Sequence, residues 1–99
     1  MSEGARRIAA ERKIHEKKWS PEHDDAHPDG SLSVFAAALA VEGTDAHVED
    51  MAGRIGEGYR EDDWGLLAKY GDDRIRCLEI AGALIAAEID RELRLRGLR

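Results

Sequence analysis

The sequence contains a single cysteine and no long apolar run. Because Cys77 is the only cysteine among the 99 residues, neither a disulfide within the chain nor a cysteine-rich zinc site can form. No apolar run approaches the roughly 18 residues that a membrane-spanning helix needs, and no signal-peptide pattern is present. We therefore expect a soluble cytoplasmic protein that does not bind a membrane.

Aromatic residues are also scarce, at 5 %, although hydrophobic residues make up 42 % of the chain. Ala and Leu supply most of the apolar volume, and 36 % of the residues are charged. This mixture favours helices, so we predict an all-α fold: a small helical bundle forming a single domain over residues 1–99. A domain of this size has little stability to spare, so we also expect a homo-oligomer.

Positive charge is lacking in the middle of the chain. Residues 19–73 carry three Lys or Arg against fourteen acids, whereas residues 1–18 and 74–99 carry a small excess of basic residues. Binding to duplex nucleic acid needs a basic face, so we expect no such partner. A divalent cation, a basic protein, or a small ligand held by a few local arginines is compatible with this distribution.

Local signals predict where the first helices begin and end. Ser2 is a suitable N-cap for a helix that reaches about Lys18 and has a thin apolar stripe. Ser20 and Pro21 suit the N-cap and the first position of a short helical turn, and the backbone is expected to break at Pro28.

Ser31 is predicted to cap a further helix from Leu32 to about Glu42, ending at Gly43. One face of this helix carries four apolar residues at helical spacing: Leu32, Phe35, Ala36 and Leu39. Residues 44–71 contain five glycines and are expected to be irregular. The expected anchors of this segment to the core are Trp64, Leu66, Leu67 and Tyr70.

The last helix gives the clearest pattern. Asp72 or Asp73 can cap it, and Gly97 can close it. We expect it to pack through one apolar stripe, formed by Ile75, Leu78, Gly82, Ile85 and Ile89 and widened by Ala81, Leu84 and Leu93. A glycine inside a helix costs roughly 1 kcal/mol relative to alanine, so Gly82 marks either the close approach of another helix or a weak point.

The densest polar stretch runs from Trp19 to His27, where three carboxylates and two imidazoles occur within six residues. Carboxylate oxygens suit Mg²⁺ or Mn²⁺ and imidazole nitrogens suit Zn²⁺, which makes Asp24, Asp25 and His27 candidate ligands of a divalent cation. A purely structural role, in which both aspartates hydrogen-bond the turn, is the alternative. We expect the stretch to meet the last helix, so the candidate ligand-binding residues are Trp19, Glu22, His23, Asp24, Asp25, His27, Glu88 and Arg91.

Two segments resemble a family of small phage and prophage proteins that share the motif W-[S/T]-P-E-H-D-D-x-H and a closing helix A-L-I-x-A-E-I-[E/D]-R. The first is Trp19 to His27, and the second is Ile80 to Arg91; together they cover about a fifth of the chain. Ile80 stands where the family often has Lys, and residues 43–72 depart from a stretch that is often rich in Trp and Pro. The resemblance implies a phage or prophage origin, and hence the host cytoplasm, but no established reaction.

A dense polar motif without a nucleophile favours a binding protein. In a phage, such a protein would sequester a nucleotide-type signal or a host factor as a means of counter-defence. One alternative is a metal-dependent nucleotide or phosphoester hydrolase with His23 or His27 as base and a cation held by Glu22, Asp24, Asp25 and Glu88. The other alternative is an acidic protein that blocks a basic surface of a host protein, which the charge of residues 19–73 suggests.

Overall fold

The computed structural model describes residues 1–26, 30–41, 69 and 72–97, and this part of the chain contains helices and no strand. In chain order the helices are α1 (Glu3–Lys18), α2 (Pro21–Asp25), α3 (Ser31–Val41) and α7 (Arg74–Leu95). The predicted all-α fold is confirmed. The four expected anchors of the middle segment, Trp64, Leu66, Leu67 and Tyr70, lie outside the described residues.

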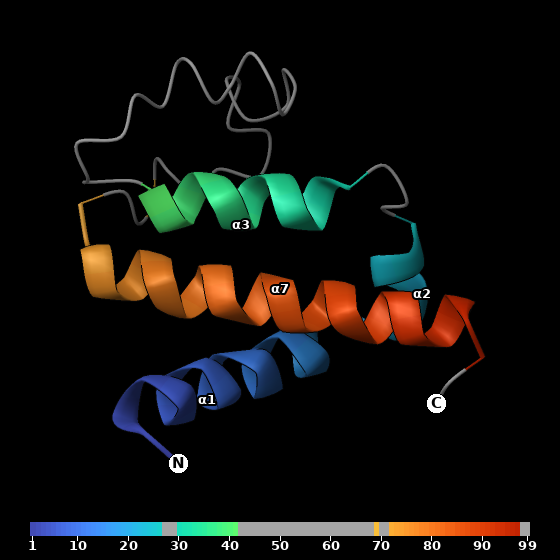
Figure 1. Cartoon of the computed structure of the whole chain (residues 1–99), viewed down its shortest axis with the longest axis horizontal. Helices are drawn as coiled ribbons and strands as arrows, with labels where there is room; N and C mark the ends of the chain where they lie inside the picture. Colours follow the sequence, from blue (N-terminus) through green and yellow to red (C-terminus); the bar gives the residue numbers. More distant parts are fainter. Residues whose placement is uncertain (27–29, 42–68, 70–71, 98–99) are drawn as a thin grey trace.

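The longest helix, α7, is the central element of this arrangement. Its 22 residues span about 33 Å at roughly 1.5 Å per residue. Figure 1 shows α1 packed along one side of α7, α3 along another, and α2 beside its C-terminal half. Every other described helix is therefore positioned by its contact with α7.

Three N-caps that the sequence predicts are confirmed. The side-chain oxygens of Ser2, Ser20 and Asp73 each accept a hydrogen bond from the backbone N–H three residues further on, at 3.1, 3.2 and 3.0 Å. Pro21 occupies the first position of α2, where its missing N–H has no helical partner to lose. Gly97 follows α7 with a φ of 67°, a left-handed conformation that suits the residue after a helix.

The start of α3 differs from the prediction. Ser31 is the first residue of the helix and not its cap, and the carbonyl of Gly30 accepts the first helical hydrogen bond, from Val34 N at 2.9 Å. Gly30 has a φ of 84°, which a residue with a side chain adopts only with strain. The sharp turn into α3 therefore depends on the glycine at position 30.

The core lies between α3 and α7. The predicted apolar face of α3 is confirmed, since its four members are all at most 3 % exposed. They pack against a face of α7 that consists of Cys77, Ile80, Ala81, Leu84 and Ala87. Cys77 is fully buried there, as expected for a small core residue.

The predicted packing stripe of α7 is wrong in most of its members. Ile75, Leu78, Ile85 and Ile89 are 60 %, 41 %, 50 % and 55 % exposed, whereas the adjacent alanine-rich face is buried. The buried face combines Ile80 and Leu84 with small side chains, and these small side chains let α3 approach α7 closely. Because α7 carries apolar residues on two faces, the pattern alone does not show which face is covered.

The expectation that a second helix approaches Gly82 closely is confirmed. A Cβ atom on Gly82 would lie 2.6 Å from both Cδ1 and Cγ1 of Ile8, which belongs to α1. That distance is far below a van der Waals contact, so the glycine is needed for α1 to take this position.

Candidate functional site

A layer of charged side chains joins α1 to α7. Glu11 is only 4 % exposed, and its two carboxylate oxygens pair with His15 Nε2 at 2.8 Å and with the guanidinium of Arg76. Arg76 also lies 3.1 Å from Glu79. The hydrogen bond that Arg76 donates to Glu11 is the main reason that the pKa of Arg76 is raised. Burial lowers the pKa of His15 despite the nearby Glu11 carboxylate, so His15 is neutral at pH 7.

The polar stretch that begins at Trp19 lies against α7, as the sequence analysis expects. Asp25 Oδ1 is 2.9 Å from Arg94 Nη2, and the same nitrogen donates to the carbonyl of Pro21 at 3.3 Å. Asp24 is buried, at 5 % exposed, and its carboxylate is 3.9 Å from Arg12 Nη2. The aspartates therefore connect α2 to the arginines of α1 and α7.

Three aromatic rings are layered beside this polar stretch. His15 meets Trp19 edge-on with ring centroids 5.1 Å apart, and Trp19 stacks on His23 at 5.6 Å. Trp19 remains 38 % exposed, and Glu22 is exposed on the same short helix. His27 lies outside the described residues.

A complete metal site is not assembled by the side chains whose positions are described, because no three of their His, Cys, Asp or Glu residues converge. Asp24 and Asp25 each face an arginine, which supplies the positive charge that a cation would otherwise supply. Since His27 is not among the described residues, the predicted cation site stays a prediction.

The two predicted residues on α7 bind each other. Glu88 Oε1 is 2.7 Å from Arg91 Nη2, and Arg91 is itself 6 % exposed. The pKa of Arg91 is raised, first by the hydrogen bond with Glu88 and to a smaller extent by the charges of Glu92 and Asp25. Arg91 is thus a second arginine of α7, beside Arg94, that interacts electrostatically with Asp25 of α2.

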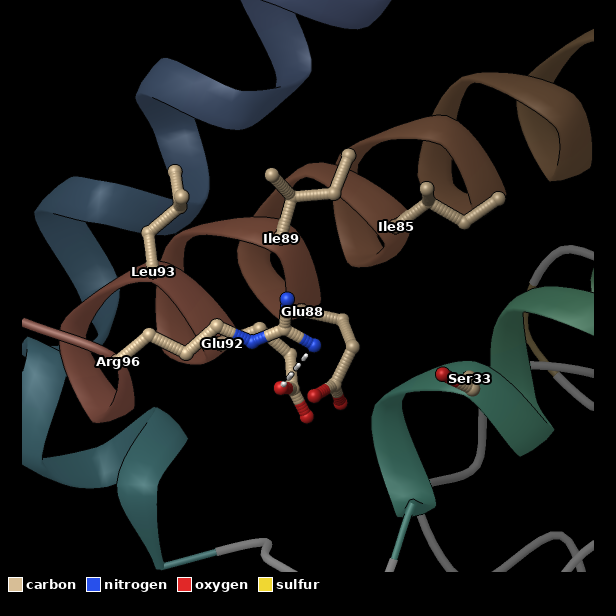
Figure 2. A pocket seen from close by; sticks show the side chains of 7 residues that line it. All are labelled: Ser33, Ile85, Glu88, Ile89, Glu92, Leu93 and Arg96. Carbon is tan, nitrogen blue, oxygen red and sulfur yellow. Dashed lines mark ion pairs between the residues drawn. The ribbon is translucent and has the colours of Figure 1, made fainter. Parts of the chain in front are cut away.

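A groove that the sequence analysis did not identify lies between α7 and the start of α3 (Figure 2). Its volume is about 290 Å³, and it is lined by Ser33, Ile85, Glu88, Ile89, Glu92, Leu93 and Arg96. Glu88 is the one predicted site residue among them. The other lining residues were not predicted because the isoleucines were expected in the core. A signal was present in the sequence, since Glu88, Glu92 and Arg96 occur at every fourth residue and place three charges beside an apolar stripe.

Glu88 has an unusual environment at this groove. Its Oε1 is bound to Arg91, but its Oε2 is buried and has no hydrogen-bond partner among the described residues. Glu92 pairs with Arg91 at 3.2 Å. It pairs more loosely with Arg96, at 3.6 Å, and this second ion pair is the dashed line in Figure 2. The groove therefore combines an apolar floor with one unsatisfied carboxylate oxygen and one weakly held guanidinium.

Comparisons with known proteins add no identification. No family model matches the chain, and neither the curated proteins nor the solved structures include a significant match. Among the described helices, none is long and apolar enough to cross a membrane.

Proposed function

We propose that this chain is a binding protein that holds a nucleotide-type small molecule in the groove between α3 and α7. The observation that carries the proposal is the buried Oε2 of Glu88, which lacks a hydrogen-bond partner among the described residues. A buried acceptor of this kind is costly, and an N–H donor on a ligand would satisfy it.

The groove suits a flat ring that carries an amino group. Ile85, Ile89 and Leu93 offer an apolar floor, and about 290 Å³ is near the lower end of small-molecule sites. Adenine, guanine and cytosine each carry an exocyclic amine, whereas uracil does not. Arg96 is exposed at the rim of the groove. Its ion pair with Glu92 is long, at 3.6 Å, so a ligand phosphate could replace Glu92 as the partner of Arg96.

Binding is favoured over hydrolysis by the state of the acidic groups. Asp24, Asp25 and Glu88 each lie beside an arginine, so a hydrolase would have to break these pairs to bind a cation. The resemblance to phage and prophage proteins supports a role in counter-defence, in which the protein removes a signal nucleotide from the host cytoplasm. The acidic segment behind the third hypothesis lies largely outside the described residues.

Isothermal titration with a panel of mononucleotides and cyclic nucleotides tests the proposal. We expect adenine, guanine or cytosine nucleotides to bind more tightly than uridine nucleotides. Glu88→Gln is expected to raise Kd about tenfold or more, because a hydrogen bond to a charged group contributes roughly 1.5–3 kcal/mol.

Glu79→Gln is a matched control for this experiment. Glu79 and Glu88 have equally exposed side chains, at 15 %, and both pair with arginine on α7, but Glu79 lies outside the groove. The control should bind like the wild-type protein. The proposal fails if no nucleotide of the panel binds at millimolar concentration, or if both variants weaken binding equally.

A further inference from the structure

The exposed apolar residues of α7 form one continuous face. Ile75, Leu78, Ile85 and Ile89 are all more than 40 % exposed and follow each other at alternating spacings of three and four residues around Gly82. Ile8 of α1 covers the glycine, so the position without a side chain is not a gap in the surface. Away from Gly82, neither α1 nor α3, which flank α7 in Figure 1, covers these four side chains, which are called below the α7 face.

The charged residues of the α7 face lie at its two ends, and at the C-terminal end Glu92 is itself in a loose ion pair with Arg96 at 3.6 Å. Arg74 precedes Ile75, and Glu92 follows Ile89 by three residues. The two charges are 18 residues apart, about five helical turns, so they project from the same edge of the helix. Arg74 is held at that edge by donating to the carbonyl of Ala40 at 2.8 Å.

We propose that a second copy of this chain docks on the α7 face, with the two α7 helices antiparallel and related by a two-fold axis near Gly82. A two-fold interface joins the same patch of both subunits, and this patch is apolar along about 21 Å of helix. Single monomers rarely expose a contiguous apolar surface of this kind.

The end charges favour the antiparallel orientation. Antiparallel helices bring like edges together, so Arg74 of each copy approaches Glu92 of the other. A parallel pair would gather both arginines at one end and both glutamates at the other, and would also align the helix dipoles unfavourably. In this antiparallel arrangement the α7 helix of the second copy begins level with Glu92. That helix would form a wall of the groove beside Ile89. The inference rests on the α7 face and holds whether or not the groove takes a nucleotide.

Sedimentation equilibrium between about 1 and 100 μM tests the association, with Ile85→Glu as the disrupting variant. We expect a dimer for the wild-type chain and at least a roughly 30-fold weaker dimer for the variant, because the charge enters the interface twice. Leu95→Glu is the matched control, since Leu95 is 65 % exposed on α7 but lies off this face. The control should dimerise normally, and circular dichroism should show equal helix content in all three proteins.

A charge exchange tests the orientation. Arg74→Glu and Glu92→Arg should each weaken the homodimer, while an equimolar mixture of the two variants should form a heterodimer with both ion pairs restored. The doubly substituted chain should again form a homodimer. A wild-type chain that remains a monomer at 100 μM overturns the proposal, and a loss of stability on Ile85→Glu in that monomer would indicate that residues of the same chain cover the face. A dimer in which the mixture shows no recovery overturns the antiparallel arrangement.

Discussion

Ile8 of α1 and Gly82 of α7 are in such close contact that no other residue fits at position 82 without displacing Ile8. A Cβ atom would lie 2.6 Å from two atoms of the Ile8 side chain and 3.0 Å from a third. This contact fixes how closely the two helices approach one another.

Gly82→Ala is expected to destabilise the protein, although alanine is the better helix former. The helix gains about 1 kcal/mol from the substitution, but overpacking a tight contact costs about 1–3 kcal/mol. We expect a net loss of about 1 kcal/mol in the free energy of unfolding, measured by urea denaturation. In an Ile8→Ala background the sign should reverse, because the clash is gone and only the helix preference remains. A gain in stability from Gly82→Ala alone would contradict the close contact.

Glu11→Gln is expected to destabilise the fold strongly. Glu11 is buried between His15 and Arg76, and removing one partner of a buried charge pair typically costs about 3–5 kcal/mol. Because the Arg76 side chain is 30 % exposed, we expect a loss at the lower end of this range, about 3 kcal/mol.

Glu3→Gln provides the control for that measurement. Glu3 also pairs with two arginines, Arg6 and Arg7, but its side chain is 65 % exposed. Exposed ion pairs contribute less than about 1 kcal/mol, so urea denaturation should detect little change. Equal losses for Glu3→Gln and Glu11→Gln would mean that burial does not decide the contribution of these pairs.

Stability should fall as the pH is lowered from 8 towards 5, partly because of His15. Burial lowers the pKa of His15 in the folded state, whereas the unfolded chain keeps the ordinary value of about 6.5. The unfolded state therefore binds more protons in this range, and folding must keep His15 neutral. The penalty is absent above the unfolded pKa and grows below it. Glu79, whose pKa is lowered from 4.5, stays ionised throughout this window.

His15→Gln should flatten this pH dependence, since glutamine keeps a hydrogen-bond donor for Glu11 but does not titrate. The measurement is the free energy of unfolding in urea at several pH values. An unchanged slope in His15→Gln would show that another group is responsible.

The Cys77 thiol should react slowly with a thiol reagent under native conditions. The side chain is 0 % exposed between α3 and α7, so the reagent reaches it only when these helices separate. Urea above the unfolding transition should release the full reactivity. Gly82→Ala should accelerate native-state labelling if it destabilises the whole fold. Immediate labelling of the native wild-type protein would contradict the assigned core.

The sequence correctly predicted those features of the fold that depend on residues close together in the chain. Ser2, Ser20 and Asp73 cap their helices because a short polar side chain can reach a backbone N–H three residues away, whatever the tertiary context. The contact at Gly82 could also be expected, since a glycine inside a good helix requires a compensating reason.

The covered face of α7 could not be predicted in the same way. Apolar bulk pointed to Ile75, Leu78 and Ile89, but the face that includes Cys77 and Ile80 packs against α3 instead. This choice involves residues far apart in the sequence. The groove was missed for the same reason, because three of its lining residues, Ile85, Ile89 and Leu93, had been assigned to the core. The position of the polar stretch beside α7 was foreseen, but its pairing with Arg12 and Arg94 was not.

The two long neighbours of α7 are attached by different forces, and the molecule should respond differently to different solvents. α1 is held to a large extent by ion pairs such as Arg12 with Asp90 at 2.9 Å, whereas α3 is held by alkyl groups and the Phe35 ring. Dissolved salt screens the more exposed pairs of the first kind, such as Arg7 with Glu79 at 3.1 Å, and cooling weakens the second kind of attachment. Ionic strength and temperature can therefore loosen opposite flanks of the same helix, each leaving the other flank in place.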